Sequence, residues 1–192
     1  MARIYSSSKS KILDAAEQVI LRDGPKGLSV DAVLREAKVS KGGFFHHFAT
    51  KEALLGALMD RLASSVELQA AERVAGDTHK IGRMLRAQIA LAFDMPPAQR
   101  ERIRALVLAL LSAVMDQPRV AQRARRTNES ALAAAMADGV GLGPALVVQL
   151  ALDGYFLGES FGTLKLDAAR KLAIRDTLLA LVAGPKRGRH GL

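Results

Sequence analysis

The chain is 192 residues long and 49% hydrophobic, which is enough apolar material for a substantial buried core. It contains no cysteine, which excludes disulfides, thiolate nucleophiles and cysteine-based metal sites. There is no run of about 18 uninterrupted apolar residues and no apolar core of a secretion signal, so we expect a cytoplasmic protein without membrane spans. The formal net charge of +9 favours an anionic partner, but the excess is largest between residues 61 and 135 and does not by itself locate a binding site.

The first predicted helix begins near Lys9. Its apolar residues recur at helical spacing, and Asp23, Gly24 and Pro25 form its predicted stop. Arg3, Lys9 and Lys11 precede the first acidic residue of the chain. Two interpretations remain open for these three cations, namely contact with phosphates or a solvated basic terminus.

Residues 28–62 are typical of three helices separated by two tight turns. Ser29, Ser40 and Thr50 are suitable N-caps for the three helices, and the middle helix is very short. Phe44 and Phe48 lie four residues apart, so both can point into one core.

The short middle helix has a polar, small and cationic face formed by Lys41, Gly42, Gly43, His46 and His47. A glycine inside a helix costs roughly 1 kcal/mol relative to alanine. The pair either relieves crowding at a turn or lets the backbone approach another surface closely. We favour the second interpretation, because a capped helix with small residues and a few donors fits the major groove of DNA.

This segment resembles the DNA-binding domain of the TetR family of bacterial transcription regulators. The residues that carry the resemblance are Ala37, Val39, Ser40, Lys41, Gly42, Phe44, Phe45, His46, His47, Phe48, Thr50, Lys51, Glu52, Ala53 and Leu54. The resemblance implies that the helix at Ser40–Phe48 binds double-stranded DNA. The residues that it implies as DNA-binding are Ser29, Ser40, Lys41, Gly42, Gly43, Phe45, His46, His47 and Lys51.

Two of these positions depart from the family pattern. Phe45 stands where the family often has a tyrosine whose hydroxyl contacts a phosphate, and Gly43 replaces a frequent threonine. Neither change affects the expected fold. Both imply that more of the DNA contact depends on Lys41, His46, His47 and Lys51. His46 and His47 are adjacent, so their side chains point about 100° apart on a helix and do not converge on a metal ion. We expect no metal and no cofactor.

The rest of the chain continues the helical pattern, and we expect an all-α fold of about nine helices. A long helix begins at Lys51, and five more follow before the end of the chain. We divide the chain into a helix-turn-helix DNA-binding domain at residues 1–55 and a helical effector-binding and dimerisation domain at residues 56–192. Ser-His-Asp arrangements, phosphate loops and metal clusters are absent from the sequence, so we expect no enzyme.

The segment after Pro144 is apolar nearly all round, as expected for a helix buried on two sides. Gly154, Gly158 and Gly162 follow at intervals of four and predict a smooth ridge against a closely packed helix. The resemblance implies that the last two helices form a homodimer interface, although packing within one subunit remains an alternative. The predicted interface residues are Gly154, Gly158, Gly162, Leu178 and Leu181.

The resemblance also implies a small-molecule effector, whose identity the sequence leaves open. The candidate ligand-binding residues combine aromatic surface with polar groups, and they are Phe93, Met95, Asp153, Tyr155, Phe156 and Glu159. The resulting hypothesis is a homodimeric, ligand-responsive repressor that binds a palindromic operator. The alternatives are an activator of the same fold, or a helical scaffold protein whose DNA-binding helix has degenerated.

Overall fold

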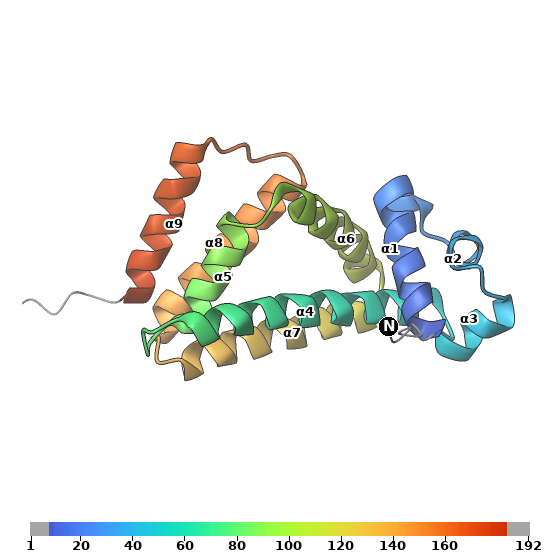
Figure 1. Ribbon diagram of the computed structural model, residues 1–192, viewed down its shortest axis with the longest axis horizontal. Helices are drawn as coiled ribbons and strands as arrows, with labels where there is room; N and C mark the ends of the chain where they lie inside the picture. The colour runs from blue at the N-terminus through green and yellow to red at the C-terminus, as the bar shows by residue number, and fades with distance from the viewer. Residues whose placement is uncertain (1–7, 184–192) are drawn as a thin grey trace, which may run out of the picture. The chain divides into compact units, whose positions relative to one another are not determined.

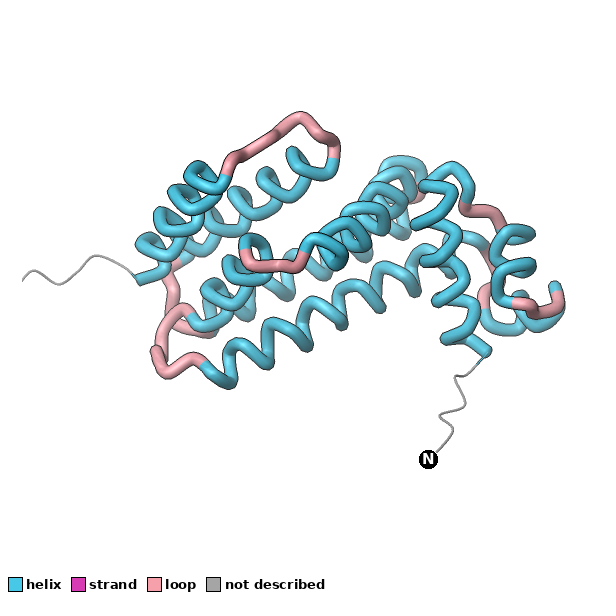
Figure 2. The backbone as a smooth tube through the Cα atoms, turned by 45° about the horizontal axis from the view of Figure 1, so that its top comes forward, coloured by secondary structure: helices cyan, strands magenta, loops and turns pink. Residues whose placement is uncertain are grey.

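The computed structural model describes residues 8–183, apart from the side chains of residues 112, 113 and 116. Arg3, one of the three cations of the basic terminus, lies outside this range. Nine helices and no strand occur among these residues, which confirms the predicted all-α fold (Figures 1 and 2). The helices are α1 (Ser8–Gly27), α2 (Val30–Ala37), α3 (Lys41–His47), α4 (Lys51–Gly76), α5 (Arg83–Phe93), α6 (Pro97–Asp116), α7 (Pro118–Ala137), α8 (Leu142–Ser160) and α9 (Ala168–Ala183). None of the described helices is long and apolar enough to cross a bilayer.

The helices form two compact units that divide the chain differently from the predicted domains. One unit contains residues 8–64 and 97–126, and the other contains residues 65–96 and 127–183. The predicted boundary after residue 55 placed all of α6 in the second domain, whereas α6 packs against α1 in the first unit. Packing thus joins segments that are distant in the sequence.

The first unit has one hydrophobic core to which α1, α3, α4 and α6 all contribute. Its most buried side chains include Ile12, Val19, Phe44, Leu54, Leu58 and Leu106, each no more than 3% exposed. The predicted stop of the first helix is present at Gly24, whose φ of 72° interrupts α1. One last turn follows and ends at Gly27. Gly24 is therefore the end of the regular part of α1.

A buried carboxylate ties α1 to two other helices of this unit. Glu17 is only 6% exposed and accepts a hydrogen bond of 3.1 Å from Nε of Arg102 in α6. It also forms an ion pair with Arg61 of α4, with 3.5 Å between Nε and Oε1. A buried charge is tolerated when it is paired and hydrogen-bonded in this way.

The second unit has a core formed by α5, α8 and α9 together with the end of α7. It buries Leu85, Ile89, Ala135, Ala145, Val148, Leu178 and Val182. A smaller cluster joins Ala70 of α4 to Ala87 and Leu91 of α5. The final helix is capped by Asp167, whose Oδ1 accepts a hydrogen bond of 2.8 Å from the backbone of Arg170.

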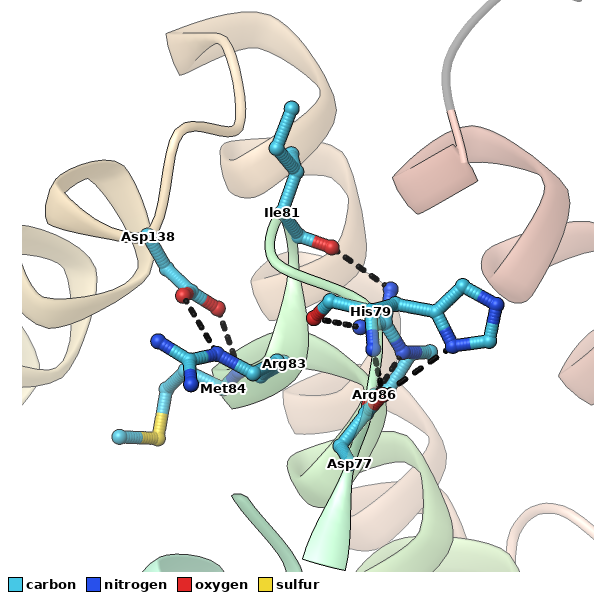
Figure 3. Close-up of polar contacts among 7 residues, drawn as sticks. All are labelled: Asp77, His79, Ile81, Arg83, Met84, Arg86 and Asp138. Atoms are coloured by element: carbon cyan, nitrogen blue, oxygen red, sulfur yellow. Dashed lines mark hydrogen bonds and ion pairs between the residues drawn. The ribbon is translucent and has the colours of Figure 1, made fainter. Parts of the chain in front are cut away.

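Polar contacts fix the loop between α4 and α5 (Figure 3). Arg86 donates from Nε to Asp77 at 2.6 Å, from Nη1 to the carbonyl of Ile81 at 2.8 Å and from Nη2 to the carbonyl of His79 at 3.1 Å. One guanidinium therefore holds three points of the loop that follows α4.

A second carboxylate in Figure 3 holds the start of α5. Asp138, directly after α7, accepts a hydrogen bond of 2.7 Å from the backbone of Met84. Its carbonyl accepts a bond of 3.0 Å from Gly82, whose φ of 78° is one that glycine adopts without strain. The end of α7 and the start of α5 are thereby joined.

The Asp77–Arg86 contact predicts a specific pH dependence of stability. The Arg86 hydrogen bond lowers the pKa of Asp77 from 3.8 to about 2, so the folded state favours the ionised carboxylate. This stabilisation is present above the unfolded pKa and is lost as the pH falls through the folded one. We expect Asp77→Asn to lower the thermal midpoint at pH 7, and we expect its difference from wild type to shrink between about pH 4 and pH 2.

The matched control is Asp176→Asn, because Asp176 is exposed and pairs with its chain neighbour Arg175. Thermal unfolding followed by circular dichroism at each pH measures both variants. A deficit for Asp77→Asn that is the same at every pH would show that ionisation of Asp77 does not stabilise the fold.

Candidate nucleic-acid interface

The helix α2 begins and ends at well-defined caps. Ser29 has an extended backbone, and its Oγ accepts a hydrogen bond of 3.2 Å from the backbone of Ala32. At the other end Lys38 adopts a left-handed conformation with φ 54°, and Val39 donates to the carbonyl of Leu34 at 3.3 Å. This end turns the chain sharply, as expected for the first of the two predicted tight turns.

The next helix, α3, starts at the predicted cap. Ser40 Oγ accepts a hydrogen bond of 3.1 Å from the backbone of Gly43, and the Ser40 carbonyl accepts one of 3.0 Å from Phe44. An N-cap serine contributes about 1 kcal/mol to a helix. In a helix of seven residues, that contribution is large relative to what the backbone alone provides.

Two aromatic side chains anchor α3 to the unit. Phe44 is fully buried and Phe48 is 2% exposed, and their ring centroids lie 5.8 Å apart. The opposite face carries the predicted DNA-binding residues of the helix, of which Lys41, Gly42, Phe45 and His46 are exposed and Gly43 and His47 are half-buried. One face of α3 therefore holds the helix in place and the other faces solvent.

The two glycines of α3 differ in what the fold requires of them. A Cβ at Gly42 would meet no atom within 4 Å, so no crowding in this chain explains the glycine. A Cβ at Gly43 would lie 3.3 Å from Oγ of the capping Ser40, which is a tight contact. Crowding thus accounts for Gly43 in part, whereas no neighbour within this chain requires a glycine at position 42.

The aromatic residues on the exposed face contact their neighbours edge to face. Phe45 is 43% exposed, and its ring meets that of Phe44 at 5.4 Å and 85°. The rings of His46 and His47 lie 5.0 Å apart at 73°. Among the described residues, no group of three or more histidine, aspartate or glutamate side chains could hold a metal ion.

The start of α4 and the start of α1 add cations near α3. Thr50 caps α4 through a hydrogen bond of 3.1 Å from the backbone of Ala53 to its Oγ1, and Lys51 follows as an exposed residue. Nζ of Lys9 lies 6.0 Å from the centroid of the Phe48 ring. Lys9 is thus held at the end of α3.

Comparison with known proteins identifies this arrangement. Residues 12–58 match the family described as bacterial regulatory proteins, tetR family, and residues 82–183, more than half of the chain, match the tetracyclin repressor-like C-terminal domain. The chain belongs to the TetR family. It is a transcriptional regulator with a DNA-binding helix-turn-helix, formed here by α2 and α3.

Curated relatives match mainly in the first part of this TetR-family protein. The A-factor receptor protein of Streptomyces griseus is 43% identical over 58 residues, which are 30% of this chain and 21% of that protein. The regulator UidR of Escherichia coli strain K12 is 26% identical over 114 residues, 59% of this chain and 55% of UidR. These matches span about half of UidR or less, so they carry no conclusion about what the whole proteins bind.

Solved structures match over nearly the whole chain. A transcriptional regulator from Rhodococcus sp. Rha1 superposes with a TM-score of 0.76 at 20% identity, covering 92% of this chain and 96% of its own. A TetR-family member from Streptomyces coelicolor A3 gives a TM-score of 0.74 at 22% identity, covering 92% and 99%. At these identities the similarity establishes the fold.

Three of the predicted ligand-binding residues come together in the second unit. The rings of Phe93 and Tyr155 stack at 4.7 Å and 12°, and Tyr155 is 4% exposed. Lys171 of α9 forms an ion pair of 2.6 Å with Glu159 and lies 5.8 Å from the Tyr155 ring centroid. Sequence reasoning missed Lys171, because it lies on a separate helix. Of the remaining candidates, Met95 and Phe156 are half-buried and Asp153 is exposed.

The predicted glycine ridge on α8 is wrong in two of its three positions. The helix ends at Ser160, and Gly162 lies in the following turn with φ 69°, where its NH donates to the carbonyl of Glu159 at 3.1 Å. A Cβ at Gly158 would lie 2.7 Å from Cβ of Leu164, so Gly158 accommodates the chain that returns after α8. Gly154 has nothing within 4 Å of its Cβ position and remains open.

The two leucines predicted for the interface also differ from each other. Leu178 is 4% exposed and belongs to the core of its own unit, so it cannot supply contact area to a partner. Leu181 is 36% exposed. Sequence reasoning missed the exposed apolar side chains of α8, because a segment that is apolar nearly all round does not reveal which face the fold covers.

The contrast between two neighbouring phenylalanines tests how α3 is anchored. We expect Phe44→Ala to lower the free energy of unfolding by about 3–5 kcal/mol, because a fully buried ring is lost. Phe45→Ala is the matched control, and we expect a change of less than about 1 kcal/mol, because its ring is 43% exposed. Urea unfolding followed by circular dichroism measures both. Equal losses in the two variants would contradict the assignment of Phe44 as the anchor.

Proposed function

We propose that the protein is a homodimeric, ligand-responsive repressor that binds a palindromic operator through α3. The observation that carries the proposal is the division of α3 into a buried face at Phe44 and Phe48 and an exposed face of small and cationic residues. A helix held in this way can enter a major groove with its N-terminus near the backbone phosphates. Lys41, His47 and Lys51 would fix the register through phosphate contacts, and Gly42 would allow close approach.

A second copy of the chain is the partner that the exposed face of α8 fits. Leu146, Val147 and Leu150 are 38%, 51% and 69% exposed, and the open Gly154 lies one turn further along the same face. Phe161, directly after the helix, is 59% exposed. A contiguous apolar stripe of this kind is typical of an interface. In a symmetric dimer the same stripe serves both subunits.

The dimer would explain the expected operator. Two copies of α3 related by a twofold axis read two half-sites about one helical turn apart, roughly 34–36 Å. The operator of such a dimer is a palindrome, because each half-site meets the same side chains. A monomer would instead bind a single half-site.

The effector would bind in the second unit, near the stacked Phe93 and Tyr155. The aromatic pair offers apolar surface, and the ion pair of Lys171 with Glu159 offers one charge of each sign. A structural neighbour, the multidrug binding protein EbrR, has been solved in complexes with ethidium and with imidazole, and it is 22% identical to this chain with TM-scores of 0.72 and 0.71. An effector would release the operator by favouring a conformation that binds DNA less tightly.

The deciding experiment is selection of bound sequences from random duplex DNA at physiological salt, followed by footprinting of the enriched sequence. We expect a palindrome with half-sites about one helical turn apart. If a specific sequence is enriched but transcription from it rises when the protein is present, the result would favour an activator of the same fold. Salt-sensitive binding without enrichment would contradict the proposal and favour a helical scaffold protein.

The proposed interface predicts that Leu150→Asp converts the dimer into a monomer. Leu150 is 69% exposed, so the substitution does not disturb the core of the chain, but it would bury an unpaired charge between two subunits. The control is Leu68→Asp in α4, because Leu68 is 63% exposed and lies outside the proposed interface. Analytical ultracentrifugation reports the mass of each variant. A dimeric Leu150→Asp variant would place the interface elsewhere.

A further inference from the structure

The start of α7 carries a dense group of cations on the same compact unit as α3. The chain has four arginines and no acidic residue between Asp116 and Glu129. Residues 118–126, which hold all four arginines, belong to the unit that contains α2, α3 and the start of α4. The backbone that carries these charges therefore has a fixed position relative to the proposed DNA-binding face.

Two contacts fix the start of α7 against α4. Val120 is 3% exposed and belongs to the core that contains Phe44. Arg123 forms a bidentate ion pair with Asp60 of α4, and its Nη1 would lie 3.0 Å from a Cβ at Gly56. The second turn of α7 is thus level with the second and third turns of α4.

The direction of α7 brings its first turn towards the start of α4. Figure 1 shows the first half of α4 and the start of α7 side by side and running in the same direction. Arg119 precedes Arg123 by four residues, so it lies roughly 6 Å closer to the beginning of α4. That beginning is Thr50 and Lys51, which directly follow α3.

Arg119 also lies on the side of α7 that faces α4. Residues four apart share a helix face, so Arg119 is on the same side of α7 as Arg123, the side that reaches α4. Arg119 is exposed. Arg126 shares this face as well, but it lies about 10 Å further from the start of α4 than Arg119 does.

We propose that Arg119 is a phosphate-binding residue, which extends the DNA contact of α3 and Lys51 to the start of α7. This inference rests on the proposed function, because DNA is the partner that brings phosphates to the start of α4. The contact is electrostatic and carries no base preference, so it raises affinity for all duplexes alike. The competing hypothesis is that Arg119 pairs with Glu52, in the first turn of α4, and does not contact DNA. It predicts that replacing Arg119 leaves the salt dependence of duplex affinity unchanged.

The experiment compares three variants by the dependence of duplex affinity on salt concentration. They are Arg119→Gln, the positive reference Lys51→Gln and the matched control Arg126→Gln. The probes are the operator obtained by selection and a random-sequence duplex of the same length. Each phosphate contact contributes about 0.9 to the slope of log affinity against log salt, so losing one contact in each subunit of a dimer lowers the slope by about 1.8.

We expect Arg119→Gln to lower the slope by this amount on both probes, with an unchanged ratio of affinities for operator and random duplex. Lys51→Gln should have a similar effect, and Arg126→Gln should retain the wild-type slope. An unchanged slope for Arg119→Gln would overturn the inference, and so would an equal fall for Arg126→Gln, which would indicate general attraction by charge. An equal thermal midpoint for wild type and Arg119→Gln shows that the fold is intact.

The two proposals fail in different ways. If the wild-type protein enriches no sequence but Arg119→Gln lowers the slope on random duplex, the repressor proposal fails and the phosphate contact remains supported. If the wild-type protein selects a palindrome and Arg119→Gln binds it with an unchanged slope, the contact is overturned and the repressor proposal stands.

Discussion

Burial of Phe44 is the constraint on which the DNA-binding face depends. A helix of seven residues is far shorter than the roughly 12–15 residues at which an isolated helix becomes marginally stable in water. Its stability must come from the cap at Ser40 and from the two anchoring rings, Phe44 and Phe48. Because these residues hold α3, its outer face can consist of residues that neither favour helix nor fill a core. Gly42, with open space beside it, is the plainest example.

The sequence predicted the parts of this site that depend on local interactions. Ser29, Ser40 and Thr50 each accept a backbone hydrogen bond from the residue three positions ahead. Such bonds are determined by a few neighbouring residues, so their pattern is visible in the sequence. The same holds for Phe44 and Phe48, whose spacing of four places both on the buried side. The helix-turn-helix and its anchors were therefore predictable, whereas the individual DNA contacts remain predictions.

The features that sequence reasoning missed are those that depend on distant segments. Nothing in residues 97–126 indicates that they join the first unit, because the contact of α6 with α1 brings together Arg102 and Glu17, 85 positions apart. The glycine ridge was wrong for a related reason, since the regular spacing of Gly154, Gly158 and Gly162 predicted a helix that in fact ends at Ser160. Leu164 then returns to occupy the space beside Gly158, which no helical pattern could indicate.

The ion pairs of Glu17 bear on how α3 could respond to an event elsewhere in the chain. Glu17 joins α1 to Arg61 of α4 and to Arg102 of α6, and leaving such a buried charge unpaired costs about 3–5 kcal/mol. A movement that separated α1 from both α4 and α6 would incur this cost. A response that kept α1, α6 and the first half of α4 together would avoid this cost and would move them as one body. In that case the proposed effector would alter the position of an intact DNA-binding face, and α3 itself would not need to unfold or repack.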